Sequence, residues 1–244
     1  MGPLSSGSRA AKPVDMRRSL GPFALRGYLK KLPIAVAALV VCFCLRASPL
    51  ALIVLNSTCQ DAGSVPAGWQ IKVHHGRPEI SACQDDDTAC VHLKSVKSSF
   101  ALEHAVDIDP AELPYLTWRW KVSQLPAGGD FRRAATDDQA AQVLVAFADR
   151  RVVAYIWDTT APKGIMENAG SIPLLRVFAV VCQSGTAALN HWIVESRNVT
   201  ADYERAYGKP APHVKGIRLQ INSQHTGSSA ESYFGEIAFR SALQ

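Results

Sequence analysis

Ten short β-rich runs, separated by turn residues, are the feature that most limits what this chain can fold into. Many short strands with turn signals between them are typical of a β-sandwich or barrel. Residues 199–207 have a helical pattern instead, and Gly208 and Pro210 follow them in the order that ends helices. The runs are residues 69–74, 91–96, 100–106, 115–122, 142–148, 152–157, 174–182, 191–196, 215–222 and 234–239. We therefore predict an all-β fold of two packed sheets with one short helix.

The length and composition favour a single globular domain. A chain of 244 residues can hold one large all-β domain, and its 48% hydrophobic and 19% charged residues are ordinary for a protein with a real core. We predict that this domain is a β-sandwich spanning residues 69–244, after a linker at residues 56–68.

Alternation along two runs shows which side chains face the core. In residues 115–122, Arg119 lies on the face opposite the apolar positions, and in residues 215–222 Gln220 and Asn222 do the same together with Arg218. If both strands lie in one sheet, that sheet has a polar face suited to a ligand. The alternative is an ordinary solvated outer face. The residues predicted to point into the core are Leu116, Trp118, Trp120, Val122, Ile217, Leu219 and Ile221.

A basic segment followed by a hydrophobic one predicts export. Residues 1–31 contain seven basic side chains and one acidic, and residues 32–55 contain two apolar runs interrupted by Arg46 and Pro49. This order is typical of a signal peptide or a signal anchor, with residues 1–31 in the cytoplasm. A buried core helix is the alternative. We expect the protein in the periplasm or cell envelope, with the membrane as a partner through residues 32–55.

The positive charge lies almost entirely outside the predicted domain. The chain has 26 basic and 21 acidic residues, so 19 basic and 20 acidic ones remain after residue 31. A nearly neutral domain does not have the basic surface that nucleic acids require. We predict no nucleic-acid partner.

The cysteines fit an exported protein. Cys83 and Cys90 flank a polar loop and could close a small disulfide hairpin in an oxidising compartment. Two reduced thiols are the alternative, and no cysteine or histidine spacing supports zinc. We predict the disulfide, no metal and no cofactor.

Four motifs resemble a known family. They read LTWRWKVSQLPAGGDFRRAATDDQAAQVLVAF, YIWDTTAPKG, WIVESRNVTADYERAYGKPAP and IRLQINSQHTGSSAESYFGEIAF. In this order they resemble the bacterial family called domain of unknown function 3047, over about residues 91–239. The resemblance implies a jelly-roll sandwich similar to carbohydrate-binding modules, with no established activity.

Several residues are candidates for ligand contact. Tyr155 and Trp157 share one strand face and could stack on a sugar, or pack in the core. Glu195 and Arg197 are two apart and could pair with each other or with a ligand.

Acidic and amide groups add further candidates. Asp137 and Asp138 lie in a loop with Arg132 and Arg133, where they could act as acids, bind a cation or form ion pairs. Residues 220–226 are rich in amides and hydroxyls, which recognise neutral polyols but also form turns.

Our leading hypothesis is a non-catalytic binder of a polar ligand such as a glycan, and whether the protein is also an enzyme is left open. A polysaccharide hydrolase or lyase using Asp137, Asp138 or Glu195 is one alternative, and an envelope structural or assembly protein is another. The predicted ligand-binding residues are Arg119, Asp137, Asp138, Tyr155, Trp157, Glu195, Arg197, Gln220 and Asn222.

Overall fold

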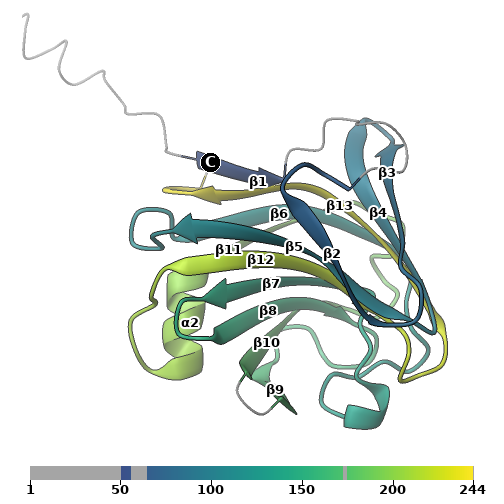
Figure 1. Cartoon of the computed structure of the whole chain (residues 1–244). Helices are drawn as coiled ribbons and strands as arrows, with labels where there is room; N and C mark the ends of the chain where they lie inside the picture. Colours follow the sequence, from purple (N-terminus) through teal and green to yellow (C-terminus); the bar gives the residue numbers. More distant parts are fainter. Residues whose placement is uncertain (1–50, 56–64, 173–174, 244) are drawn as a thin grey trace, which may run out of the picture. The chain divides into compact units, whose positions relative to one another are not determined.

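The computed structural model describes residues 51–55, 65–172 and 175–243, and they form two β-sheets with one α-helix (Figure 1). The chain divides into the units Met1–Ala47 and Ser48–Gln244, and only the second contains described residues. The predicted region 1–31, most of the segment 32–55 and most of the linker 56–68 therefore lie outside the described residues.

Sheet A has the strand order β11-β6-β13-β4-β3, with β1 also paired to β13. Every pairing in it is antiparallel. Its strands are β1 (Ala51–Leu55), β3 (Glu79–Asp85), β4 (Thr88–Val96), β6 (Tyr115–Gln124), β11 (Ile193–Asn198) and β13 (Ser229–Arg240).

Sheet B has the order β2-β5-β12-β7-β8-β10-β9. Its pairings are antiparallel except for β10 with β8, which run parallel. Its strands are β2 (Trp69–His75), β5 (Ser99–Ile108), β7 (Ala141–Phe147), β8 (Arg151–Asp158), β9 (Met166–Ile172), β10 (Leu175–Ser184) and β12 (Val214–Asn222).

The core between the sheets is centred on aromatic side chains of β6 and β8. Trp118 lies 5.1 Å from Tyr155, and Trp120 lies 6.0 Å from Trp157, between ring centroids. Offset and tilted rings at these distances pack favourably. The predicted inward positions are confirmed: Leu116, Trp118, Trp120, Val122, Ile217, Leu219 and Ile221 are all buried.

All ten predicted runs overlap strands, and three further strands among the described residues were missed. The strand β3 (EISACQD) is too polar to be distinguished from a loop. The strand β9 (MENAGSI) contains too few β-branched residues to be recognised as a strand. The strand β1 lies at the end of the range 32–55 predicted as a signal or anchor, yet it pairs with β13. In the part of the chain that the structure describes, no helix has the length and hydrophobicity to cross a bilayer.

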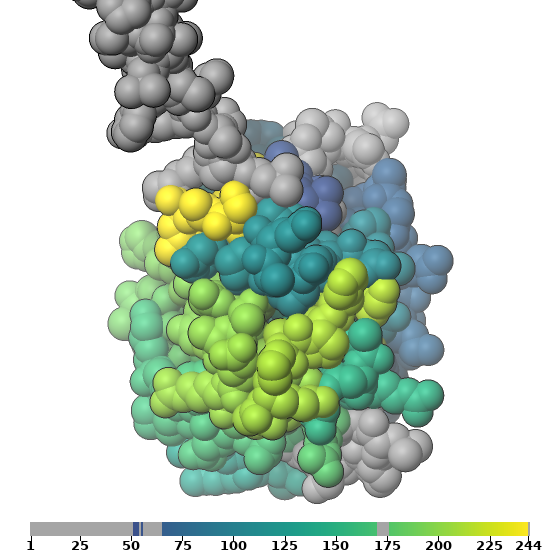
Figure 2. Space-filling model, turned by 90° about the vertical axis from the view of Figure 1, so that its left-hand side faces the viewer, coloured from purple at the N-terminus to yellow at the C-terminus, as the bar shows by residue number. Residues whose placement is uncertain are grey.

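The helix α2 (Val199–Tyr207) coincides with its prediction because both ends carry clear signals. The Asn198 side chain accepts a hydrogen bond from Ala201 N, and Gly208 takes the left-handed conformation (φ 67°) that ends the helix. Thr200 Oγ1 donates to Pro110 O at 2.9 Å, which attaches the helix to the β5–β6 connection. Figure 2 shows this end of the sandwich, with the green α2 region below the teal connection.

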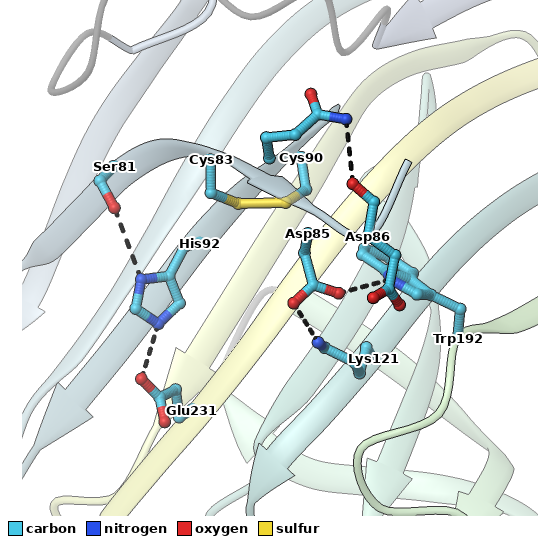
Figure 3. The surroundings of a disulfide bond; sticks show 10 residues. Ser81, Cys83, Asp85, Asp86, Cys90, His92, Lys121, Trp192 and Glu231 are labelled. Carbon is cyan, nitrogen blue, oxygen red and sulfur yellow. Dashed lines mark hydrogen bonds and ion pairs between the residues drawn. A yellow bond between two sulfur atoms is a disulfide. The ribbon is translucent and has the colours of Figure 1, made fainter. Parts of the chain in front are cut away.

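The predicted disulfide is present between Cys83 and Cys90, which face each other across the β3–β4 hairpin (Figure 3). Nearby, His92 Nε2 lies 2.8 Å from Glu231 Oε1 on β13, and Trp192 Nε1 donates to Asp85 Oδ2 at 2.7 Å. The disulfide therefore closes an edge hairpin that side chains from two other segments also hold.

Reducing this disulfide is expected to lower the free energy of unfolding by about 2 kcal/mol, the entropy of closing a short loop. Urea unfolding of the oxidised and reduced protein measures the difference. The variant carrying Cys83→Ser and Cys90→Ser should match the reduced protein and ignore reductant. If reduction leaves the midpoint unchanged, the bond does not contribute to stability.

Candidate ligand-binding cleft

A cleft of about 660 Å³ lies over the outer face of sheet B, the face turned away from sheet A. Its lining comes from the β5, β12, β7, β8, β10 and β9 strands and from the loop that includes Phe131 and Asp137. This volume is in the range of small-molecule sites. Strands from sequence positions 99 to 222 therefore build one site.

The strand register arranges the lining in rows, because residues paired across neighbouring strands point to the same face. The middle row, from β5 to β10, is Glu103, Arg218, Leu144, Ala154 and Ala179. On one side of it lie Gln220, Gln142 and Ile156. On the other side lies what we call the small-residue row, consisting of Ala105, Gly216, Ala146, Val152, Val177 and Ala169.

The half of the cleft over β5, β12 and the start of β7 is polar. Arg218 Nη2 lies 2.5 Å from Glu103 Oε1, so their charges offset each other. Asn222 is fixed on both sides of its amide: Oδ1 accepts from Gln142 Nε2 at 2.7 Å, and Nδ2 donates to Asp137 O at 2.7 Å. The polar half is therefore preorganised.

The half over β7, β8 and β10 is apolar. Leu144, Val152, Ala154, Ile156 and Ala179 belong to a second apolar cluster, separate from the core between the sheets. These strands are thus apolar on both faces, as the runs QVLVAF, RVVAYIW and RVFAVVC show. Strands buried on both faces read as continuous hydrophobic runs.

Two buried carboxylates hold the loops that frame the apolar half. Asp158, which is fully buried, accepts backbone hydrogen bonds from Phe131 N at 3.0 Å, Thr160 N at 2.9 Å and Ala161 N at 2.7 Å. Burial raises the pKa of Asp158, and these three bonds partly offset that effect. One carboxylate therefore joins the loop at Phe131 to the turn after β8.

The loop before β7 is held by a second carboxylate, Asp130. Hydrogen bonds from Arg132 hold the pKa of Asp130 down at about 2. Thr160 Oγ1 also donates to Asp130, at 3.1 Å. Arg133 lies 3.8 Å from the same carboxylate, so both arginines of this loop interact with Asp130 and not with Asp137 or Asp138.

The adjacent residues Asp137 and Asp138 have different surroundings. Asp137 lines the cleft, accepts from Gln139 Nε2 at 3.0 Å, and has its pKa raised by burial. Asp138 is fully buried, and its Oδ2 accepts from Thr226 N at 2.6 Å and Thr226 Oγ1 at 2.8 Å. Asp138 therefore fastens the loop before β13, and only Asp137 faces the cleft.

The interpretation of Tyr155 and Trp157 as a stacking platform is wrong. Both side chains are 0% exposed and point between the sheets. Tyr155 Oη donates to Asp202 Oδ2 at 3.0 Å, and Trp157 Nε1 donates to Gly185 O at 3.2 Å. The residues of β8 that reach the cleft are Val152, Ala154 and Ile156.

Arg119 also lies away from the cleft, because β6 belongs to sheet A. Its guanidinium stacks over Trp192 at 5.6 Å from the ring centroid. The two polar rows predicted from the sequence therefore lie in different sheets. The cleft is lined by the second row, which consists of Arg218, Gln220 and Asn222.

Glu195 and Arg197 form a separate polar cluster near α2 and do not bond to each other. Glu195 Oε1 accepts from Gln183 Nε2 at 2.7 Å, and burial raises the pKa of Glu195. Arg197 Nε donates to Asp202 Oδ2 at 2.8 Å. Neither residue lines the cleft.

Of the nine predicted ligand-binding residues, the cleft brings together Asp137, Gln220 and Asn222. Sequence reasoning missed Glu103, Gln142 and the apolar half. The continuous apolar runs were the available signal. Among the described residues, no group of three or more histidine, cysteine, aspartate or glutamate side chains is placed to hold a metal ion.

These features define a two-sheet β-sandwich with a ligand-sized cleft on the outer face of one sheet. The chain belongs to the family described as "Protein of unknown function (DUF3047)", whose model matches residues 67–238. The family resemblance in the motifs is thereby confirmed. None of the curated proteins compared with the chain matches its sequence.

The chain is also similar to several solved structures, at very low sequence identity. The xyloglucanase domain of NopAA, a type three effector from Sinorhizobium fredii in complex with cellobiose, is 8% identical, with 72% of this chain and 94% of that chain covered and a TM-score of 0.45. The family 11 carbohydrate-binding module of Lic26A-Cel5E of Clostridium thermocellum is 6% identical, with 81% and 98% covered and a TM-score of 0.43. Endoglucanase cel12A from Rhodothermus marinus is 9% identical, with 78% and 99% covered and a TM-score of 0.44.

Proposed function

We propose that this protein binds a polar, polyhydroxylated ligand, such as a glycan, in the cleft on sheet B. The observation that carries the proposal is the polar half of the cleft, where Gln220, Gln142 and Arg218 lie side by side. Amide and guanidinium groups donate hydrogen bonds to hydroxyl oxygens, and amide oxygens accept from hydroxyl hydrogens. Gln220 is half-buried and makes no side-chain hydrogen bond within the described residues, so its amide can serve a ligand.

We also propose that the domain is exported, which would place its ligand outside the cytoplasm. The basic residues 1–31 and the apolar run of residues 32–45 support a proposal that the domain is carried to the periplasm or cell envelope and contacts the membrane through its N-terminal segment. An envelope polysaccharide or glycolipid would be within reach there.

The test is a glycan panel, with binding measured by thermal shift and titration calorimetry. For the glycan that binds, Gln220→Ala is expected to weaken affinity about tenfold, the value of one lost hydrogen bond. The melting temperature of the protein without ligand should change little.

The matched control is Arg119→Ala, on the outer face of sheet A, which should bind like the wild type. If both substitutions weaken binding equally, or if neither does, the polar half of the cleft is not the glycan site.

A hydrolase is the second candidate, because Glu103 and Asp137 both line the cleft. A general acid needs a raised pKa, and burial raises the pKa of Asp137. Release of reducing ends from a bound glycan, abolished by Asp137→Asn with binding retained, would favour this candidate over simple binding.

A further inference from the structure

The apolar half of the cleft does not suit a sugar ring. Sugar rings stack on exposed aromatic faces, and among the described residues Phe131 is the one phenylalanine, tyrosine or tryptophan in the lining, with only 3% of it exposed. The other side chains that line this half are alanine, valine, leucine and isoleucine, and Ala146, Ala169 and Val177 among them are only partly buried. The outer face of an antiparallel sheet is usually polar when water covers it. This half is therefore built for an aliphatic group.

The small-residue row, with Ala154 and Ala179 of the middle row beside it, forms a strip of small side chains along this aliphatic surface, which we call the trough. From Gly216 on β12 to Ala169 on β9 the small-residue row crosses five strands, or about 19 Å at about 4.8 Å per strand spacing. The row begins beside the polar half, since Gly216 lies two residues from Arg218 on the same face of β12. A long, slender occupant fits this shape.

Packing does not require the smallest of these residues. A Cβ added to Gly216 would meet its nearest neighbour, His104 O, at 3.5 Å and Ala146 Cβ at 3.9 Å, which are ordinary contacts. Gly216 has no positive φ that would demand glycine. The space above it therefore stays open although the fold could fill it.

The charges beside the trough favour a neutral head group. Glu103 and Arg218, the charged pair of the polar half, offset each other. The lining also includes Asp137 and Arg150, which have opposite charges, and two further basic residues that are paired with carboxylates outside the lining: Arg151 with Asp149 and Lys215 with Asp107. The amides of Gln142, Gln220 and Asn222 are the neutral polar groups there, and they suit hydroxyls.

We propose that the ligand is a neutral amphiphile, whose polyhydroxylated head lies on the polar half and whose unbranched aliphatic chain lies along the small-residue row. This inference rests on the proposed function and narrows its ligand to a glycolipid-like class. The head is positioned by hydrogen bonds, and the chain provides most of the affinity by leaving water.

The role of the ligand's aliphatic chain is tested by titration calorimetry with maltose and with hexyl, octyl and decyl maltoside, each below its micelle concentration. Each added methylene is expected to lower the dissociation constant about fourfold until the small-residue row is filled, with one ligand molecule bound per protein molecule. Ala146→Leu fills the row and should remove this dependence on chain length. Ala187→Leu, an exposed alanine outside the lining, is the matched control and should leave it unchanged.

Circular dichroism first establishes that Ala146→Leu folds, and Ala169→Leu at the far end of the row replaces it otherwise. If affinity is independent of chain length, or if Ala146→Leu and Ala187→Leu behave alike, the amphiphile inference is overturned. A glycan bound through Gln220 would then still support the proposed function. If decanol binds as tightly as decyl maltoside and Gln220→Ala changes neither affinity, the site for the aliphatic chain is supported, and the proposed glycan head group on the polar half is contradicted.

Discussion

Replacing Asp158 with alanine is expected to lower the free energy of unfolding by about 3 to 5 kcal/mol, because two buried backbone N–H groups and one partly buried one lose their acceptor. These groups belong to Phe131, Thr160 and Ala161. Since Phe131 and Ala161 cover the apolar cluster beside the cleft, the substitution should also loosen that wall. Urea unfolding measures the loss, and hydrogen exchange at the three amides should increase.

Two variants test this explanation. Asp158→Asn keeps only one oxygen, whereas the carboxylate uses Oδ2 for Phe131 and Oδ1 for the other two amides, so an intermediate loss is expected. Asp87→Ala, at an exposed carboxylate in the β3–β4 turn, should change stability by less than about 0.5 kcal/mol. An Asp158→Ala protein within 1 kcal/mol of the wild type would show that water or another group replaces the carboxylate.

The sequence predicted best those elements that have one apolar face. In β6 the tryptophans alternate with Thr117, Arg119 and Lys121, so period two revealed both the strand and its inward side. In α2 the cap residues Asn198 and Gly208 marked both ends. Local chemistry determines such elements, and local chemistry is what a sequence displays.

The cleft was hidden because its strands are apolar on both faces. Alternation cannot tell Tyr155, which faces the core, from Ala154, which faces the cleft, when both neighbours are hydrophobic. Residue type alone favours aromatic side chains as binding groups, yet volume favours placing the largest rings in the core. The exposure of a side chain depends on what packs against its face of the sheet, and the sequence does not show which segments pack there.

Sheet membership was also beyond the sequence. Arg119 and Gln220 occur in similar patterns, but β6 pairs with β11 and β13, whereas β12 pairs with β5 and β7. Likewise Glu195 and Arg197 share a strand face, but their bonding partners come from β10 and α2. Pairings between distant segments decided which polar residues share a site.

Replacing Trp157 with alanine is expected to lower the free energy of unfolding by about 3 to 5 kcal/mol and to leave ligand affinity of the folded protein unchanged. The indole is fully buried beside Trp120, 6.0 Å away between centroids, and its Nε1 bonds to Gly185 O, so truncation leaves a large cavity. Chemical unfolding and binding at a temperature where the variant is folded measure the two effects separately. Trp157→Phe refills part of the space and should lose less stability. The sugar-stacking hypothesis predicts the opposite pattern, lost binding with stability intact, and that result would place Trp157 at the ligand.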